Sequence, residues 1–322
     1  MSQKDSAVRA GEVVARGRRL GAKAPGNPFA KIRFNAGGAT LLTITPAVSL
    51  AVRQRRAVGE RRRLRGHGGG PTGVGGVPDR LQGGVGGVDR QALTAEADAV
   101  GVGLGQAEIE VLAALAAAVA EAPFNVGGLH GPEDIRRKHL VDSLGCLRTL
   151  SPSDGEWVVD LGSGAGFPGL PLAVARPKVR FTLVEATGKK AAFLRGVVGE
   201  LGLSRVDVVQ ARAEELGRDP AWRERVDGVV ARAVAPLSTL VEWALPLCRV
   251  GGRLVALKGP AADAEVAAAG RALAELRGRV TRADRFRLPG GPEERVVLAV
   301  LKTGATPVRY PRRAGVASRR PL

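Results

Sequence analysis

The sequence predicts an α/β fold built on a doubly wound, seven-stranded sheet. From Gly155 onward, short runs rich in β-branched residues alternate with helical stretches, a pattern that places helices on both faces of a largely parallel sheet. A glycine-rich turn follows the first of these runs. The last two runs are separated by little more than a Pro-Gly-Gly-Pro turn, so we expect them to pair antiparallel.

The individual elements follow from local patterns. Residues 106–122 combine strong helix formers with apolar residues at helical spacing. A second helix is expected over 131–150, because Pro132 and the acids Glu133 and Asp134 suit a first helical turn. A further helix is expected over 262–277, and others between the first five strands. The seven strands are expected at 157–162, 180–186, 206–211, 227–233, 252–259, 280–288 and 294–302.

Charge and composition divide the chain into four expected segments. These are a basic, glycine-rich extension over 1–105, N-terminal helices over 106–150, the α/β domain over 151–302 and a basic tail over 303–322. Residues 1–95 carry 17 Lys/Arg and 5 Asp/Glu, and residues 96–301 carry 26 of each. Residues 302–322 carry 6 Lys/Arg and no Asp/Glu. Because the extension has little apolar surface to offset the entropy lost on ordering, we expect it to be disordered. Basic ends around a neutral body favour a polyanionic partner.

The remaining composition argues for a reducing cytoplasmic compartment. Cys146 and Cys248 are too few for a disulfide framework and lack the paired spacing of a zinc site, so no metal centre is expected. The apolar run over 39–52 is too short to cross a bilayer and contains Pro46. It also starts too far along the chain for an export signal. We therefore expect no association with a membrane.

The end of the first strand is the expected ligand site. Ligands of open α/β sheets bind beyond the carboxyl ends of the strands, and this strand runs into GSGAGFPG (162–169). Gly162 and Gly164 allow a sharp turn and a close approach of the backbone to a ligand. Asp160 stands just before this turn. Glu185 ends the next strand, where its carboxylate can accept hydrogen bonds from both hydroxyls of a ribose.

Two classes of ligand fit this pattern. Gly164, Gly166 and Gly169 have the spacing of a dinucleotide fingerprint, which keeps a nicotinamide-dependent oxidoreductase open. The Asp160 carboxylate instead favours a ligand with an ammonium group, such as the methionine part of S-adenosylmethionine, because it would repel a pyrophosphate. The antiparallel last strand is also typical of methyltransferases rather than dehydrogenases. S-Adenosylmethionine is therefore the favoured cofactor.

Six motifs that occur in order resemble those of one family. They are DLGSGAGFPGLPLAVARP, EATGKKAAFL, RAEEL, ARAVAPL, GGRLVALKGP and RYPRRAGVASRRPL, and the similarity spans residues 124–322. In these motifs the chain resembles the glucose-inhibited division protein B family (RsmG). The resemblance implies a class I methyltransferase sheet, which is Rossmann-like. It also implies transfer of a methyl group from S-adenosylmethionine to N7 of a guanine in 16S ribosomal RNA.

The resemblance also implies which residues act. It places cofactor contacts on Gly162, Phe167, Glu185, Ala186, Thr187, Ala213, Glu214 and Arg232, to which the reasoning from the residues adds Asp160 and Gly164. Asp142 and Ser143 belong, with three basic neighbours, to a segment that resembles the family's basic-His-Asp-Ser helix. The candidates for RNA binding are Arg137, Lys138, His139, Lys258, Arg309, Tyr310, Arg312, Arg313, Arg319 and Arg320.

The tail is expected to bind RNA without forming part of a core. Its arginines stand among prolines, and no acid follows Lys302, so we expect them to contact phosphates and Tyr310 to offer a stacking surface to a base. Replacing the five arginines should then leave cofactor affinity unchanged.

Guanine N7 carries an unprotonated lone pair at neutral pH, so its methylation needs no general base. We therefore expect catalysis by placement, with no catalytic residue assigned. The expected partner of this monomer is 16S ribosomal RNA or the small ribosomal subunit. One alternative from another class stays open, a non-catalytic RNA-binding or ribosome-assembly protein on the same fold.

Overall fold

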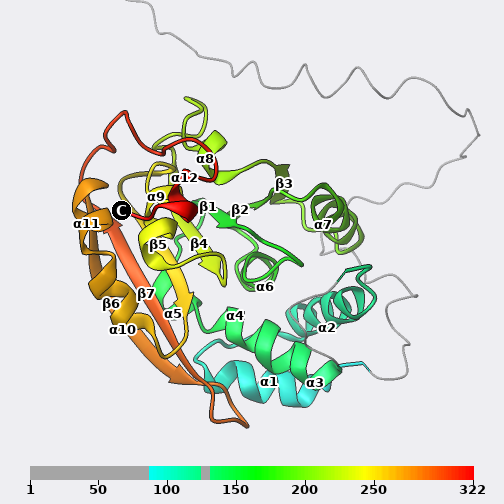
Figure 1. Cartoon of the computed structure of the whole chain (residues 1–322). Coiled ribbons are helices and arrows are strands. Elements are labelled where there is room, and N and C mark those ends of the chain that lie inside the picture. Colours follow the sequence, from blue (N-terminus) through cyan, green and yellow to red (C-terminus); the bar gives the residue numbers. More distant parts are fainter. Residues whose placement is uncertain (1–86, 125–130) are drawn as a thin grey trace, which may run out of the picture. The chain divides into compact units, whose positions relative to one another are not determined.

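The computed structural model describes residues 87–124 and 131–322 (Figure 1). These residues form a seven-stranded sheet in the order β3-β2-β1-β4-β5-β7-β6. Each strand lies at its predicted place, within a few residues. The strands are β1 (Trp157–Leu161), β2 (Arg180–Glu185), β3 (Val206–Gln210), β4 (Val226–Arg232), β5 (Cys248–Lys258), β6 (Gly278–Arg287) and β7 (Glu294–Lys302).

The last strand, β7, confirms the predicted antiparallel pairing. Strands β1 to β5 pair in parallel, whereas β7 runs antiparallel to both of its neighbours, β5 and β6. Lys258, at the end of β5, stands opposite Val296, near the start of β7. The first residues of β7 therefore lie at the edge of the sheet where the parallel strands end, which is the edge that carries ligand sites in such folds.

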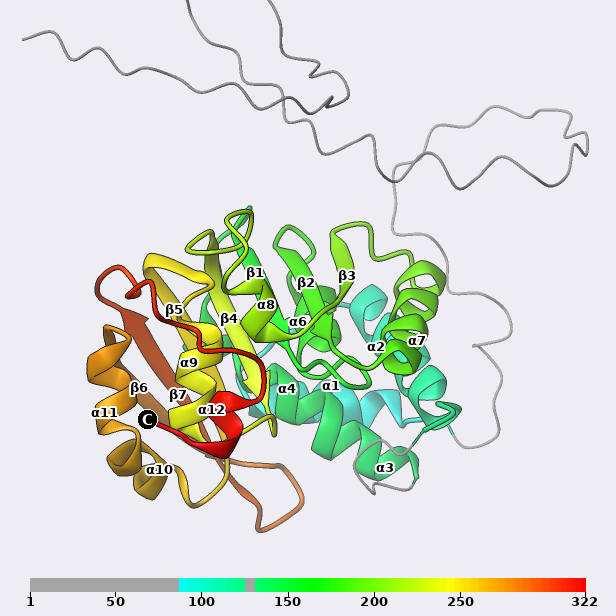
Figure 2. The same ribbon diagram turned by 45° about the horizontal axis from the view of Figure 1, so that its top comes forward.

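Helices cover both faces of the sheet, which confirms the doubly wound prediction (Figure 2). On one face Leu112, Leu170 and Leu194 pack against the sheet around Phe181. On the other face Leu240 packs with Leu254 and its neighbours. The first face is covered by α2 (Gln106–Ala120), α6 (Gly169–Ala175) and α7 (Gly188–Glu200), and the second by α8 (Ala213–Leu216), α9 (Leu237–Ala244), α10 (Ala262–Ala268) and α11 (Gly270–Glu275).

A helix, α1 (Arg90–Ala99), lies inside the segment over 1–105 for which disorder was predicted. The Asp89 carboxylate caps it by accepting a hydrogen bond of 3.0 Å from the Ala92 amide. Leu93 and Ala97, four residues apart and on one face, are fully buried. The prediction was wrong for residues 87–105, because two apolar residues at the right spacing outweigh the flanking glycines. Residues 1–86, with the basic and glycine-rich runs, lie outside the described residues.

The helix predicted over 106–122 is confirmed, but the one predicted over 131–150 is wrong as a single element. It consists of α3 (Pro132–Ile135), a π-helical turn η3 (Arg136–Val141), α4 (Asp142–Leu144) and α5 (Leu147–Leu150). Pro132 does stand in the first turn, as expected. The wider π-helical turn falls on Arg137, Lys138 and His139, and π-helical turns often occur at functional sites.

The C-terminal residues do contribute to a core, contrary to the prediction for the tail. Tyr310 is 5% exposed and Ala317 is fully buried. The short helix α12 (Val316–Arg319) packs beside α9 (Figure 2). Within 87–124 and 131–322, none of the helices combines the length and the apolar character needed to span a bilayer.

Candidate cofactor and substrate site

The glycine turn after β1 has the geometry that its residues predict. Gly162 has a φ of +69°, and a Cβ there would lie 3.0 Å from the Val234 side chain. Its amide donates a hydrogen bond of 2.8 Å to the Val184 carbonyl of β2. Only glycine combines this left-handed backbone with so close a neighbour, so the turn is held tightly against the ends of β2 and β4.

Asp160 lies beneath this turn and is fully buried. Its Oδ2 accepts a hydrogen bond of 3.0 Å from the Gly169 amide, whereas its buried Oδ1 has no hydrogen-bond partner among the described residues. Burial raises the pKa of this carboxyl to about 7, against the opposing effect of the Gly169 amide. A cation brought close to Asp160 would therefore relieve an unfavourable buried charge.

Glu185 joins the end of β2 to the glycine turn. One carboxylate oxygen accepts a hydrogen bond of 3.0 Å from the Gly164 amide, and the other accepts one of 2.7 Å from the Thr187 amide. Each oxygen keeps a second lone pair for a ligand hydroxyl. Glu185 is buried, and neither it nor Asp160 nor Thr187 lines the two cavities described next.

Two cavities open at the carboxyl edge of the sheet and meet at Gly162 and Val234, which line both. The larger has a volume of about 710 Å³ and the smaller about 170 Å³. The predicted residues Gly162, Gly164, Phe167, Lys138, His139, Arg232 and Lys258 line the larger cavity, and Ala186, Ala213 and Glu214 line the smaller. The structure thus brings most of the predicted site residues together around two joined spaces.

The smaller cavity has the donor and acceptor that an adenine ring requires. The buried Nε1 of Trp243, which also lines this cavity, has no hydrogen-bond partner among the described residues. A buried N–H without a partner is costly, and an aromatic ring nitrogen would satisfy it. The Glu214 carboxylate provides an acceptor for an amino group in the same cavity. The residues present therefore fit the adenosine part of S-adenosylmethionine.

The larger cavity is organised around the Arg232 guanidinium. It donates hydrogen bonds to the Lys138 carbonyl (2.9 Å) and the Asp142 carboxylate (3.2 Å), and it lies 2.7 Å from Nδ1 of His139. Because arginine can only donate, this contact requires Nδ1 of His139 to accept. The same ring stacks on Phe167 with 4.5 Å between centroids. His139 is therefore held in place by two groups.

Arg295 belongs to this cavity but was missed by the sequence reasoning. Its Nε donates a hydrogen bond of 2.9 Å to Asp142, so both Asp142 oxygens are occupied by arginines. Arg295 stands near the start of β7, where the antiparallel direction returns the chain to the ligand edge. The predicted topology alone could have indicated this position.

The basic candidates for RNA binding fall into two groups. Lys138 and Lys258 line the larger cavity, and Lys258 also pairs with Glu265 at 2.7 Å. Arg137 does not line the cavity, because its Nε donates a hydrogen bond of 2.7 Å to the Pro289 carbonyl in the β6–β7 turn. Its side chain is 11% exposed, so Arg137 packs this turn against η3.

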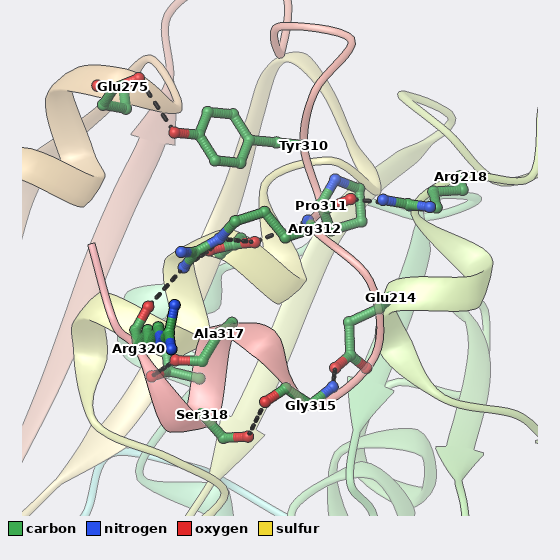
Figure 3. Close-up of polar contacts among 12 residues, drawn as sticks. Glu214, Arg218, Glu275, Tyr310, Pro311, Arg312, Gly315, Ala317, Ser318 and Arg320 are labelled. Atoms are coloured by element: carbon green, nitrogen blue, oxygen red, sulfur yellow. Dashed lines mark hydrogen bonds and ion pairs between the residues drawn. The ribbon is translucent and has the colours of Figure 1, made fainter.

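The candidates for RNA binding in the tail also fall into two groups, one exposed and one held against the protein. Arg313, Arg319 and Arg320 are exposed, and Arg309 is exposed beside its partner Glu275. Arg312 instead makes a bidentate ion pair with the buried Glu242, and the Tyr310 hydroxyl donates to Glu275 (Figure 3). The Tyr310 ring, predicted as a stacking surface, is buried. The Arg312 guanidinium, predicted to contact phosphate, is paired with a carboxylate of the protein itself.

The fold and site define a class I S-adenosylmethionine-dependent methyltransferase. The strand order with an antiparallel β7, the glycine turn after β1 and the acid that ends β2 all lie where this class has them. This class excludes the nicotinamide-dependent oxidoreductase that the glycine spacing left open.

The comparisons with known proteins assign the chain to one family within that class. Residues 109–289 match the family model "rRNA small subunit methyltransferase G" (GidB). The chain is 45% identical over 198 residues to the "Ribosomal RNA small subunit methyltransferase G" of Pelotomaculum thermopropionicum, which covers 62% of this chain and 83% of that protein. It is 49% identical over 201 residues to the protein of the same name in Deinococcus deserti, and this match covers 62% of this chain and 82% of that protein. The chain belongs to the rRNA small subunit methyltransferase G family, as its motifs suggested.

One solved structure with a similar fold is that of cofactor-bound Rv0187 from MTB. It has a TM-score of 0.46 and 23% sequence identity, and the match covers 67% of this chain and 99% of that one.

Proposed function

We propose that this methyltransferase transfers a methyl group from S-adenosylmethionine to N7 of a guanine in 16S ribosomal RNA of the small subunit. One observation carries the choice of N7. Of the acidic and histidine side chains that line the larger cavity, Asp142 is paired with two arginines, His139 with Arg232, and Glu265 with Lys258. Such a cavity suits a nucleophile that needs no deprotonation.

The pair of Lys258 and Glu265 also supports guanine as the base. Both described contacts of the Glu265 carboxylate, from the Leu237 amide and from Lys258, go to Oε2. On its Watson–Crick edge guanine has the O6 acceptor beside the N1–H and N2–H donors. A cation next to a carboxylate is complementary to that edge, whereas N7 lies on the neighbouring Hoogsteen edge beside O6.

The cofactor contacts that we propose lie along the smaller cavity and around the glycine turn beside it. Ala186, Ala213 and Glu214 surround the adenine, Glu185 and Thr187 lie at the ribose, and Asp160, Gly162 and Gly164 lie toward the methionine part. When bound, S-adenosylmethionine supplies an electrophilic methyl group.

The contribution of the protein is placement. The stacked His139 and Phe167 form a rigid wall, and Arg232 holds this wall to β4. The basic residues Lys138, Lys190 and Arg295 line the same cavity and favour a phosphate backbone near its mouth. Holding N7 in line for attack can contribute roughly 7 to 11 kcal/mol in favourable cases.

The reaction product tests this proposal. Small ribosomal subunits from a strain without the family's enzyme are incubated with the protein and radiolabelled S-adenosylmethionine, and the RNA is digested to nucleosides. We expect label in 7-methylguanosine of 16S RNA. Label in any other nucleoside contradicts the N7 proposal. Binding of S-adenosylhomocysteine and of subunits without any transfer would favour the non-catalytic alternative.

Base recognition is tested by Glu265→Gln. The variant should lose about tenfold or more in kcat/KM for the RNA, since a charged hydrogen bond is worth roughly 1.5 to 3 kcal/mol. Its affinity for S-adenosylhomocysteine should not change. Asp263→Asn is the matched control, because Asp263 lies on the same helix with 77% of its side chain exposed and pairs with Arg285. Equal kcat/KM values for both variants would contradict the role of Glu265.

A further inference from the structure

The C-terminal segment 303–322 lines the smaller cavity. Gly315 and Ser318 belong to its wall, which also includes Ala186 after β2. The Gly315 amide donates a hydrogen bond of 2.9 Å to the Glu214 carboxylate, whose own residue lines the cavity (Figure 3). A segment that follows the last strand thus touches a residue that we place beside the adenine.

The segment is held to the body by a buried ion pair. Glu242 on α9 is fully buried, and both of its oxygens accept hydrogen bonds from the Arg312 guanidinium, at 2.6 to 3.0 Å. Glu242 also accepts a hydrogen bond of 2.8 Å from the Arg312 amide. Bidentate pairs of this kind fix geometry as well as charge. The neighbouring residue of Glu242 is Trp243, which also lines the smaller cavity.

Further contacts on each side of Arg312 keep the segment in one path. Upstream, Arg218 donates a hydrogen bond of 2.8 Å to the Pro311 carbonyl (Figure 3), and Arg223 donates one of 2.7 Å to the Tyr310 carbonyl. Downstream, the Thr239 hydroxyl donates to the carbonyl of the buried Ala317. The Arg312 guanidinium also donates to the Arg320 carbonyl at 2.9 Å. The part that reaches the cavity is thus held upstream by the loop between α8 and β4 and downstream by α9.

We propose that the segment 303–322 is the adenine-side wall of the cofactor site, anchored by the Glu242–Arg312 pair, and that cofactor affinity depends on this anchor. Arg312 is then a positioning residue, because it acts through Gly315 and Ser318. The inference rests on the S-adenosylmethionine site and does not depend on which nucleotide is methylated.

Two substitutions of Arg312 test the anchor by calorimetric titration with S-adenosylhomocysteine. If Arg312→Ala leaves the wall in place in only about a tenth of the molecules, the Kd rises about tenfold. Arg312→Lys keeps the charge but loses the bidentate geometry, so its Kd should lie between those of the wild type and Arg312→Ala. Arg313→Ala is the matched control, because Arg313 is adjacent and exposed, and its Kd should equal that of the wild type.

A measurement on the unaltered full chain keeps the test independent of folding. Hydrogen–deuterium exchange is compared with and without S-adenosylhomocysteine. We expect the ligand to slow exchange in peptides that cover 312–320 and to leave those of the β6–β7 turn, 288–293, unchanged. This experiment decides the matter if Arg312→Ala, which leaves a buried carboxylate unpaired, proves unfolded by its melting curve. Exchange over 312–320 that is unaffected by the ligand, or an unchanged Kd in a folded Arg312→Ala, overturns the proposal.

Discussion

At the scale of single residues, Arg232 and Asp160 show two ways of placing a charge inside this protein. Arg232 is surrounded by acceptors, namely a carbonyl, the Asp142 carboxylate and the His139 ring. Among the described residues, Asp160 has one amide donor to Oδ2 and no partner for Oδ1, and burial raises its pKa to about 7. A complete set of partners holds Arg232 in the cavity wall, whereas Asp160 remains poised to interact with a cation.

Asp160→Asn should stabilise the ligand-free protein above pH 7 and weaken its binding of the cofactor. Because the folded-state pKa of about 7 exceeds the unfolded value near 3.8, the folded state binds more protons between these pH values. The free energy of unfolding therefore falls as pH rises through this window, by an amount on the order of 4 kcal/mol. Asparagine does not titrate, so this loss should disappear.

Melting curves of the ligand-free proteins at pH 5 and pH 8 measure the effect of Asp160→Asn, and calorimetry with S-adenosylhomocysteine measures the affinity. Asp207→Asn is the control, because Asp207 is a surface residue that pairs with the exposed Arg180. If the wild type and Asp160→Asn lose the same stability between the two pH values, the buried charge is not the cause. An unchanged affinity would remove Asp160 from the cofactor site.

At the scale of elements, the π-helical turn η3 explains how separate pieces reach one site. The turn leaves the Lys138 carbonyl to accept a hydrogen bond from Arg232 on β4, and it brings His139 against Phe167. At the C-terminal end of β7, away from the cavities, lies Lys302, whose side chain is fully buried. Its Nζ donates to Glu224 and to the carbonyls of Leu245 and Cys248, at 2.7 to 2.8 Å.

Lys302→Met should destabilise the fold without removing the site chemistry. The change leaves the Glu224 carboxylate and two buried carbonyls without their donor, which we expect to cost on the order of 3 kcal/mol in the free energy of unfolding. Denaturant titration measures this cost. Lys178→Met is the control, because Lys178 is 74% exposed in its surface pair with Asp154, and it should change stability by less than about 0.5 kcal/mol. A cost as small as that of the control would show that the buried ammonium group is dispensable.

At the scale of the whole molecule, the core extends further toward the N-terminus than the methyltransferase sheet requires. Leu93 and Ala97 of α1 are buried in the same cluster as Leu112 of α2 and Phe181 of β2. The Arg136 side chain on η3 also pairs with Glu96 of α1 at 2.9 Å. Helix α1 therefore supports the π-helical turn that carries His139.

Two deletions separate this helix from the residues before it. Removing 1–105 takes away α1 and should lower the melting temperature and weaken binding of S-adenosylhomocysteine, because η3 loses the pair with Glu96 and an apolar support. Removing 1–86 alone should leave both properties unchanged, because the sequence predicts no core there and its arginine- and glycine-rich runs from Arg53 onward offer little apolar surface. Scanning calorimetry and titration compare the two. Equal losses from both deletions would show that residues 1–86 support the fold, and no loss from either would show that α1 is not part of it.

The sheet, its antiparallel last strand and the glycine turn could be predicted from the sequence alone, because they depend on local patterns of β-branched residues, helix formers and turn residues. The sequence also indicated Gly162, Phe167, Glu214 and Arg232, which do lie at the cavities. The roles of the tail and of α1 became clear only from the folded arrangement. Arg312 and Arg313 are the same residue type at adjacent positions. Arg312 nevertheless pairs with the buried Glu242, 70 residues away in the sequence, whereas Arg313 is exposed. Such a difference depends on which distant side chain the fold brings close, and no local pattern carries that information.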